Sequence, residues 1–349
     1  MGLFPEHIAT PLLNSASPWA STEADLASLW ACPSTDAITT RTCTLTGYPD
    51  DPKKHQVAFF GNKSSINSFG FSPFPLGQYL DWIRNIVSRR DGEEKKKIII
   101  VSIGASDETE LEQMLAALDS FARELDWTDL GVEFNASCPN LNDAAPPAYV
   151  PALLESYLRV FARYAADPQR RLKFGIKLPP YTYEEQIVAV VRAIETVSKE
   201  AKTEAEDDDV VEVVSFLTST NTLGQGLIFS SQVTEPMRTD DKIAQRPDKA
   251  ASEEFGVPNG YGGLAGESIH QLSLGNVRRL RSLLNTSRDA RVRGITLIGV
   301  GGVCDTDGAE RFRRAGADAV AVATAFGREG IDVFDKIRNG SPRAGSDRS

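Results

Sequence analysis

The 349-residue chain has few cysteines, few histidines and no long apolar run. Its cysteines, Cys32, Cys43, Cys138 and Cys304, lie far apart and form no CxxC pair, which argues against a zinc site and against a disulfide framework. We therefore expect no metal and a reducing compartment. No stretch approaches the roughly 18 apolar residues of a membrane span, and the first residues lack a basic start followed by an apolar core. The expected location is the cytoplasm, without a membrane partner.

An excess of basic residues is also missing. The chain has 48 Asp and Glu against 38 Lys and Arg, which gives a formal net charge of -10. A surface with this balance disfavours nucleic acids and anionic membranes as main partners, because their phosphates are negatively charged. Small molecules are the expected ligands.

Short apolar runs rich in β-branched residues recur along the chain, and each run is continuous rather than alternating. Such runs are typical of strands that are buried on both faces of a parallel sheet. The runs lie at 37–40, 97–104, 131–137, 172–178, 210–220, 295–302 and 319–325. Helical patterns occupy 107–124, 151–166, 183–201, 272–285 and 307–315. This alternation predicts an α/β fold with a parallel sheet.

Polar, glycine-rich and asparagine-rich motifs repeatedly follow the predicted strands. They favour a (β/α)₈ TIM barrel over a doubly wound sheet, because barrel active sites are built at the C-terminal ends of the strands. We expect one domain over residues 1–338 and a disordered tail over 339–349. The acidic run 199–209 is predicted to be a solvated helix end, whereas the polar segment 235–260 is long enough to be a lid or an idle loop.

Two motifs follow the last two predicted strands. The sequence "IGVGG" at 298–302 ends one strand, and "VATAFG" at 322–327 ends the next. Exposed backbone N–H groups at adjacent barrel strands can bind a phosphate, so the pair indicates a phosphorylated ligand or cofactor. Two tight turns that require glycine are the alternative explanation.

Lys177 ends an apolar strand, where its charge must be satisfied by a ligand or a carboxylate unless the side chain extends to solvent. The polar cluster 218–222 and Asn67 follow other predicted strands. Asparagine offers both a donor and an acceptor, which suits the amide edge of a heterocycle. Turn chemistry alone is the alternative for either cluster.

Cys138 follows a predicted strand and lies in the polar loop "ASCPNLN". A lone cysteine is more often a small buried residue than a nucleophile, but this position favours a functional thiol. His7, His55 and His270 are far away in sequence, so a Cys-His hydrolase is disfavoured. A thiol that handles a proton is the remaining interpretation.

Taken together, these motifs resemble dihydroorotate dehydrogenases, in particular the soluble class that uses fumarate as electron acceptor. The similarity runs from about residue 8 to 340 and rests on "FNASCPNLN", "GIKLPPY", "TNTLGQGL", "YGGLAG", "IGVGG" and "VATAFG", in this order. It implies an FMN enzyme of pyrimidine biosynthesis that converts dihydroorotate to orotate and passes electrons to fumarate, giving succinate. It also implies ping-pong kinetics and a homodimer.

The resemblance implies roles for individual residues, with Cys138, Lys177 and Arg41 as catalytic candidates. Cys138 would remove the C5 proton of dihydroorotate while a hydride leaves C6 for N5 of FMN, and a free thiol pKa of about 8.5 suits this role. Lys177 would stabilise negative charge on the reduced flavin. Substrate contacts would come from Arg41, Asn67, Phe69, Gly70, Asn135, Asn140, Asn221 and Thr222. Cofactor contacts would come from Ser15, Ala16, Ser17, Thr42, Asn135, Lys177, Thr220, Gly266, Gly301, Gly302, Ala323 and Thr324.

The chain also departs from the family's pattern. Where the family has "TKSST", with a lysine near flavin and substrate, this chain has "TRTCT" at 40–44 and therefore Arg41. The family's "NASG" becomes "NSAS" at 14–17, its "IGTA" becomes "VATA" at 322–325, and the segment after "TLTG" is longer. Two alternatives stay open: an FMN oxidoreductase paralogue with another substrate or acceptor, and a flavin-binding protein with little turnover.

Arg41 is the departure on which these alternatives depend most. Arginine is longer than lysine, planar and bidentate, so the replacement is not conservative at a tight site. If Arg41 is a handicap, Arg41→Lys should raise turnover. An unchanged or lower rate would indicate a pocket that has adapted to the arginine.

Overall fold

The computed structural model of the chain describes residues 3–5, 8, 10–88, 97–125, 130–137, 145–167, 172–204, 211–235, 254–258 and 260–340. The last helix ends at Asn339, and residues 341–349 of the predicted tail lie outside the described residues. The prediction of a single domain with a disordered tail therefore stays a prediction.

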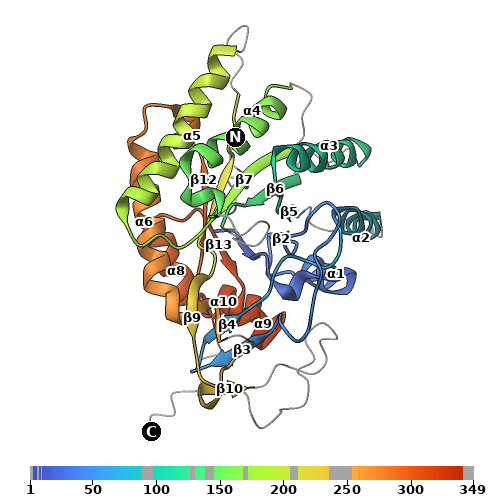
Figure 1. Cartoon of the computed structure of the whole chain (residues 1–349), viewed down its shortest axis with the longest axis vertical. Helices are drawn as coiled ribbons and strands as arrows, with labels where there is room; N and C mark the ends of the chain where they lie inside the picture. Colours follow the sequence, from blue (N-terminus) through green and yellow to red (C-terminus); the bar gives the residue numbers. More distant parts are fainter. Residues whose placement is uncertain are drawn as a thin grey trace.

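Within the described residues, eight parallel strands close into a barrel, and helices form the layer around it (Figure 1). The predicted (β/α)₈ barrel is confirmed. In chain order the barrel strands are β1 (Leu12–Asn14), β2 (Ala37–Thr39), β5 (Ile98–Ile103), β6 (Leu130–Asn135), β7 (Leu172–Leu178), β8 (Phe216–Ser219), β12 (Thr296–Val300) and β13 (Ala319–Val322). The helices are α1 (Glu23–Ala31), α2 (Leu76–Ser88), α3 (Glu108–Glu124), α4 (Pro151–Ala165), α5 (Glu184–Glu204), α6 (His270–Thr286), α7 (Ala290–Arg293), α8 (Thr306–Ala315), α9 (Thr324–Glu329) and α10 (Asp332–Asn339).

Strand β5 shows why the barrel strands read as continuous apolar runs. All of its residues are buried. Ile99, Val101 and Ile103 pack in the core that the strands share with the surrounding helices. Ile98 and Ile100 point the other way and pack inside the barrel. Because successive side chains of a strand point to opposite faces, both faces must be apolar here.

The barrel interior changes from apolar to polar along its axis. Near the start of the strands, Leu3 joins the apolar interior cluster, and its backbone N–H donates to Thr296 Oγ1 at 3.1 Å. Further along, the buried carboxylate of Glu133 accepts hydrogen bonds from Ser102 Oγ at 2.9 Å and Thr218 Oγ1 at 2.6 Å. Buried charge requires such partners. The polar part of the interior thus faces the C-terminal ends of the strands.

A five-stranded antiparallel sheet, which the sequence analysis did not predict, covers one end of the barrel (Figure 1). Its strands are β3 (Val57–Phe60), β4 (Ser64–Asn67), β9 (Leu223–Leu227), β10 (Val233–Glu235) and β11 (Tyr261–Gly266), in the order β10-β3-β4-β11-β9. β3 and β4 connect β2 to α2, and the other three connect β8 to α6. Both connections leave the C-terminal ends of barrel strands, so the sheet lies at the end where barrel enzymes bind their ligands.

The two predicted surface insertions are only partly described. Helix α5 continues through the acidic run as far as Glu204, and 205–209 lie outside the described residues. Of the segment 235–260, most also lies outside them, but Phe255 forms a bridge with Phe229 beside the antiparallel sheet. None of the helices within the described residues combines the length and apolar character needed to cross a membrane.

Candidate active site

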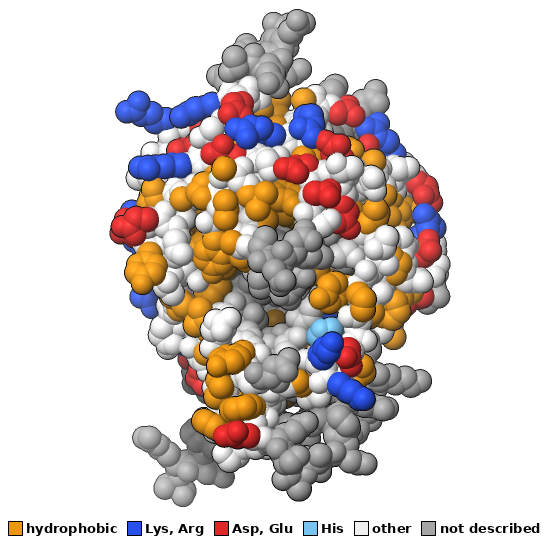
Figure 2. All heavy atoms as spheres, in the orientation of Figure 1, with side chains coloured by type: hydrophobic (Ala, Val, Ile, Leu, Met, Phe, Trp, Pro, Cys, Tyr) orange, Lys and Arg blue, Asp and Glu red, His pale blue; other side chains and the backbone are white. Residues whose placement is uncertain are grey.

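Two cavities open at the C-terminal ends of the barrel strands. The inner cavity is lined by the ends of β12 and β13 and measures about 520 Å³ together with the solvent at its mouth, while the outer one, measured in the same way, is about 1730 Å³. The cavities are neighbours, because Lys177, Asn221 and Thr222 line both. Figure 2 shows a central hollow on one face of the molecule, with apolar side chains around much of it and a group of basic, acidic and histidine side chains at its lower right.

The predicted site residues converge on these two cavities. Within the described part of the chain, each of them lines one cavity or both. The inner cavity is lined by Ser15, Ala16, Lys177, Thr220, Asn221, Thr222, Gly266, Gly301, Gly302, Ala323 and Thr324. The outer cavity is also lined by Ser17, Arg41, Thr42, Asn67, Phe69, Gly70 and Asn135. Cys138 and Asn140 lie outside the described residues, but Ser137, directly before Cys138, lines the outer cavity.

Glycines shape the wall of the inner cavity. Gly302 has a φ of +73°, a conformation that residues with a side chain rarely adopt. A Cβ atom at Gly302 would lie 2.8 Å from the carbonyl oxygen of Gly266. Ser65 of β4 and Thr324 of α9 approach each other at 3.1 Å between their hydroxyl oxygens, which joins the antiparallel sheet to this wall. At these glycines the wall of the inner cavity is therefore backbone without a side chain.

Lys63 is a residue of the inner cavity that sequence reasoning missed. It lies in the turn between β3 and β4, and its Nζ is 3.2 Å from Asp305 Oδ2. A hydrogen bond with Cys304 raises the pKa of the Lys63 ammonium, burial opposes this shift, and the bond with Asp305 adds to it. Lys63 thus places a positive charge beside the glycine-rich wall. A lysine in a polar turn gives no such signal in the sequence.

Lys177 lies at the junction of the two cavities. It is the second-last residue of β7 and is buried. Its Nζ donates to Ser15 Oγ at 3.2 Å and to the carbonyl oxygen of Ala16 at 3.3 Å. These contacts fix the position of the ammonium group between β7 and the segment after β1.

Asparagine side chains in the outer cavity form one hydrogen-bonded group. Asn135, at the end of β6, donates from Nδ2 to Thr42 Oγ1 at 3.3 Å. Its Oδ1 accepts from Ser137 Oγ at 2.7 Å and from Asn221 Nδ2 at 3.3 Å. Thr42 in turn contacts Ser102 of the buried polar interior at 2.9 Å. These hydrogen bonds, which reach into the barrel interior, fix the orientation of Asn135 and Asn221 and so preorganise their amides for a ligand.

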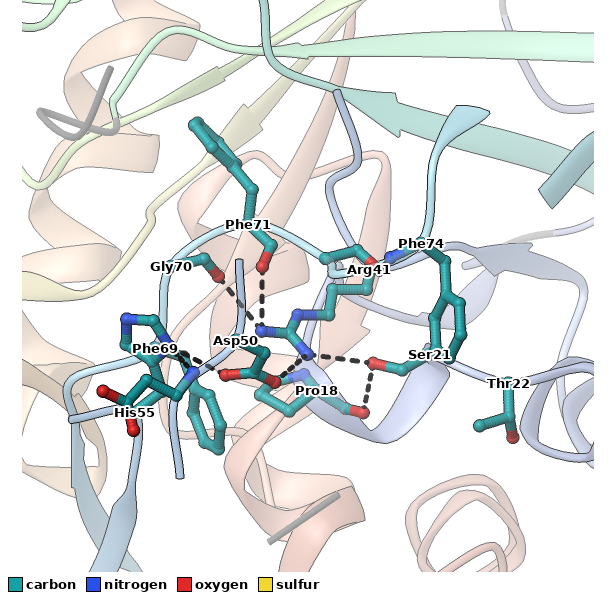
Figure 3. Close-up of polar contacts among 12 residues, drawn as sticks. Pro18, Ser21, Thr22, Arg41, Asp50, His55, Phe69, Gly70, Phe71 and Phe74 are labelled. Carbon is teal, nitrogen blue, oxygen red and sulfur yellow. Dashed lines mark hydrogen bonds and ion pairs between the residues drawn. The ribbon is translucent and has the colours of Figure 1, made fainter. Parts of the chain in front are cut away.

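Arg41 lines the outer cavity, but its guanidinium group is bound to other groups of the chain (Figure 3). Its Nη2 donates to the carbonyl oxygens of Gly70 at 3.2 Å and Phe71 at 3.1 Å. Its Nη1 donates to Ser21 Oγ at 3.4 Å and lies 3.8 Å from Asp50 Oδ2. The sequence predicts Arg41 as a catalytic and substrate-binding residue, and it does not reveal these partners.

The Arg41 side chain is also buried, unlike a cation that is free to bind a ligand. The side chain is only 3% exposed, and its guanidinium carbon lies 5.2 Å from the ring centroid of Phe69. Burial lowers the pKa of Arg41, while Tyr79 and Asp50 oppose that shift. Arg41 therefore holds the turn 69–71 in place at the wall of the outer cavity.

The shape and polarity of the site fit FMN, which the resemblance implies. Ser17 Oγ is buried and has no hydrogen-bond partner within the described part of the chain, although it belongs to a residue that lines the outer cavity. A ligand with polar edges would satisfy it. The narrow inner cavity suits a phosphate tail, and the wider outer cavity suits a flat ring and a second small molecule. Among the described residues, no group of three His, Cys, Asp or Glu side chains could hold a metal ion.

A parallel barrel with a cavity at the C-terminal ends of its strands, lined by both apolar and polar groups, is the arrangement of a barrel enzyme. A family model described as dihydroorotate dehydrogenase matches residues 5–343. The chain therefore belongs to the dihydroorotate dehydrogenase family of oxidoreductases, and the predicted family membership is confirmed.

Curated relatives support the same family. The chain is 26% identical over 339 residues to "Dihydroorotate dehydrogenase (fumarate)" of Trypanosoma cruzi. This alignment covers 96% of this chain and 89% of that protein. The chain is also 28% identical over 301 residues to "Probable dihydroorotate dehydrogenase A (fumarate)" of Streptococcus pneumoniae. That alignment covers 86% of this chain and 78% of the relative. Each alignment covers most of both chains, but most aligned residues differ.

Proposed function

We propose that this protein oxidises dihydroorotate to orotate in pyrimidine biosynthesis, with FMN as cofactor and fumarate as electron acceptor. The observation that carries the proposal is the convergence of the predicted site residues on two neighbouring cavities in a chain of this family. The acceptor is supported by the names of the relatives from Trypanosoma cruzi and Streptococcus pneumoniae. The proposed location in the cytoplasm rests on the composition of the chain and on the resemblance, and assembly as a homodimer rests on the resemblance alone.

The inner cavity is the proposed site of the FMN phosphate. Gly301, Gly302, Ala323 and Thr324 line it, and backbone at barrel strand ends binds phosphate well. FMN, when bound, accepts the hydride that leaves C6 of the substrate. Lys177 lies where both cavities meet, so its ammonium can stabilise negative charge that develops there.

Substrate binding and proton removal are assigned to the outer cavity. Asn67, Asn135 and Asn221 line it, and each amide can donate to a carbonyl and accept from a ring N–H of a pyrimidine. Cys138 is the proposed base for the C5 proton, and Asn140 and Thr222 complete the proposed substrate contacts. Support for Cys138 comes from Ser137, which places the chain at the cavity one residue earlier.

Arg41 favours a second candidate, an FMN oxidoreductase of the same family with a different substrate or acceptor. Its cation is paired with Asp50 and its donors are directed to backbone carbonyls, so the outer cavity offers less free positive charge than its sequence indicates. Such a cavity would favour anionic substrates less strongly.

Anaerobic mixing separates the two candidates. The purified, FMN-loaded protein should be yellow, and dihydroorotate should bleach the visible flavin band, which fumarate should then restore. Bleaching without recovery by fumarate would retain the substrate and reject the acceptor. A flavin that stays oxidised in the presence of dihydroorotate would reject the proposed function in favour of the second candidate. Protein that takes up no FMN would reject both.

A further inference from the structure

The wall of the outer cavity contains an ion pair in which Asp50 faces Arg41 (Figure 3). Asp50 Oδ2 lies 3.8 Å from Arg41 Nη1, and the Asp50 side chain is only 16% exposed. Asp50 Oδ1 also lies 2.8 Å from Nδ1 of His55. Opposite charges at this distance interact more strongly in a partly buried site than in water, because solvent screens them less.

The segment that carries Asp50 packs directly on the turn 69–71. The backbone N–H of Tyr48 donates to the carbonyl oxygen of Ser72 at 2.8 Å. The Tyr48 ring meets the Phe71 ring edge-on at 6.0 Å, and a Cβ atom at Gly70 would lie 2.7 Å from the Tyr48 ring. Asp50 is therefore held close to a turn that lines the outer cavity.

Arg41 connects three separate parts of the chain at this point. Its planar guanidinium group contacts Ser21, Asp50 and the two carbonyl oxygens of the turn. Among the described residues that line the outer cavity, Arg41 and Lys177 are the charged ones. A carboxylate that offsets Arg41 therefore removes much of the positive charge available to a ligand there.

We propose that Asp50 is a specificity-determining residue, which offsets the charge of Arg41 and thereby limits the preference of the outer cavity for anionic over neutral pyrimidines. In this arrangement Arg41 is a positioning residue for the turn 69–71, and Asp50 sets the charge of the wall behind that turn. The inference rests on the proposed function, since it takes the ligand to be a pyrimidine that carries a carboxylate.

The test compares orotate with uracil, which is the same ring without the carboxylate, in Asp50→Asn loaded with FMN. Asparagine removes the charge but keeps an acceptor for Arg41. Dissociation constants are measured from the change that each ligand causes in the absorption spectrum of bound flavin. The preference for orotate over uracil should rise by about tenfold, as expected for a newly uncompensated buried cation near the ligand.

Asp51→Asn is the matched control, because it removes the same charge one residue further along. The Asp51 side chain is 42% exposed, so solvent screens it and the preference should not change. An unchanged preference in Asp50→Asn, or an equal rise in both variants, would overturn the inference.

A second measurement keeps the inference testable if orotate does not bind to the wild-type protein, an outcome that would reject the proposed substrate. The midpoint potential of bound FMN requires no substrate. An uncompensated Arg41 should stabilise the more negative reduced flavin, so the potential of Asp50→Asn should lie above that of Asp51→Asn. Equal potentials in the two variants would overturn the inference on their own.

Discussion

The inner and outer cavities are neighbours, yet they are built in different ways. The inner one includes glycine backbone at the ends of two neighbouring barrel strands, where Gly302 leaves no room for a side chain. The outer one is walled by side chains from several distant segments, and Arg41 ties three of them together. A backbone site offers the same N–H donors with many sequences, whereas a side-chain site changes with each substitution. The outer cavity is therefore where this chain can differ from its relatives.

The largest effect is expected at Cys138, the proposed base of the outer cavity. Cys138→Ala should slow flavin bleaching by dihydroorotate at neutral pH by about 10²- to 10⁴-fold, the usual contribution of a general base. FMN binding should not change, because the proposed phosphate site lies in the inner cavity. Anaerobic stopped-flow absorbance measures the rate, and the visible spectrum of the purified variant measures the bound FMN.

Cys32→Ala is the matched control for Cys138→Ala. Cys32 is a partly exposed free cysteine that follows α1 and lines neither cavity. Its rate should equal that of the wild-type protein. Bleaching of Cys138→Ala at the wild-type rate would show that another group removes the proton.

A smaller loss is expected for Arg41→Lys. The sequence alone left open whether lysine would raise turnover, and the contacts of Arg41 now predict a decrease of about tenfold in kcat/KM, because one ammonium group cannot replace a planar fork. The turn 69–71 should loosen, so KM should account for most of the change. Arg84→Lys makes the same chemical change at an exposed ion pair with Glu124 and should leave kcat/KM unaltered. A higher turnover in Arg41→Lys would identify the arginine as a handicap.

The barrel could be predicted from the sequence because strands such as β5 are apolar on both faces. β1 was not found, since Leu12–Asn14 is short and contains no β-branched residue. The antiparallel sheet was not found because β9 and β11 are rich in glycine and partly exposed, so they lack the β-branched pattern of a strand.

The site shows the same limit. Strand-end motifs placed residues such as Gly302 and Asn135 at the cavities, because a barrel brings all C-terminal strand ends together. The partner of Arg41 could not be predicted in this way. Asp50 lies in a loop of ordinary polar composition, and only the folded chain brings it to 3.8 Å from the guanidinium group. Whether a charged side chain acts on a ligand depends on such partners, which no motif records.

The smallest effect is expected at Lys63, which puts a side-chain charge beside the backbone wall of the inner cavity. If Lys63 faces the phosphate of FMN, Lys63→Gln should weaken FMN binding by about fivefold, a modest value because the side chain is 38% exposed and shares its charge with Asp305. Riboflavin, which has no phosphate, should bind equally well to both proteins. Quenching of flavin fluorescence gives the two dissociation constants.

Lys54→Gln is the control for this measurement. Lys54 is 70% exposed, so this substitution removes the same charge from the surface. If both variants weaken FMN binding equally, the effect is that of net charge, and the Lys63 side chain makes no specific contribution to the phosphate site. If only Lys63→Gln does so, and only for FMN, the inner cavity also depends on a side chain. The two cavities would then differ only in how much their ligand binding depends on side chains, because Lys63 would contribute to binding in the inner one.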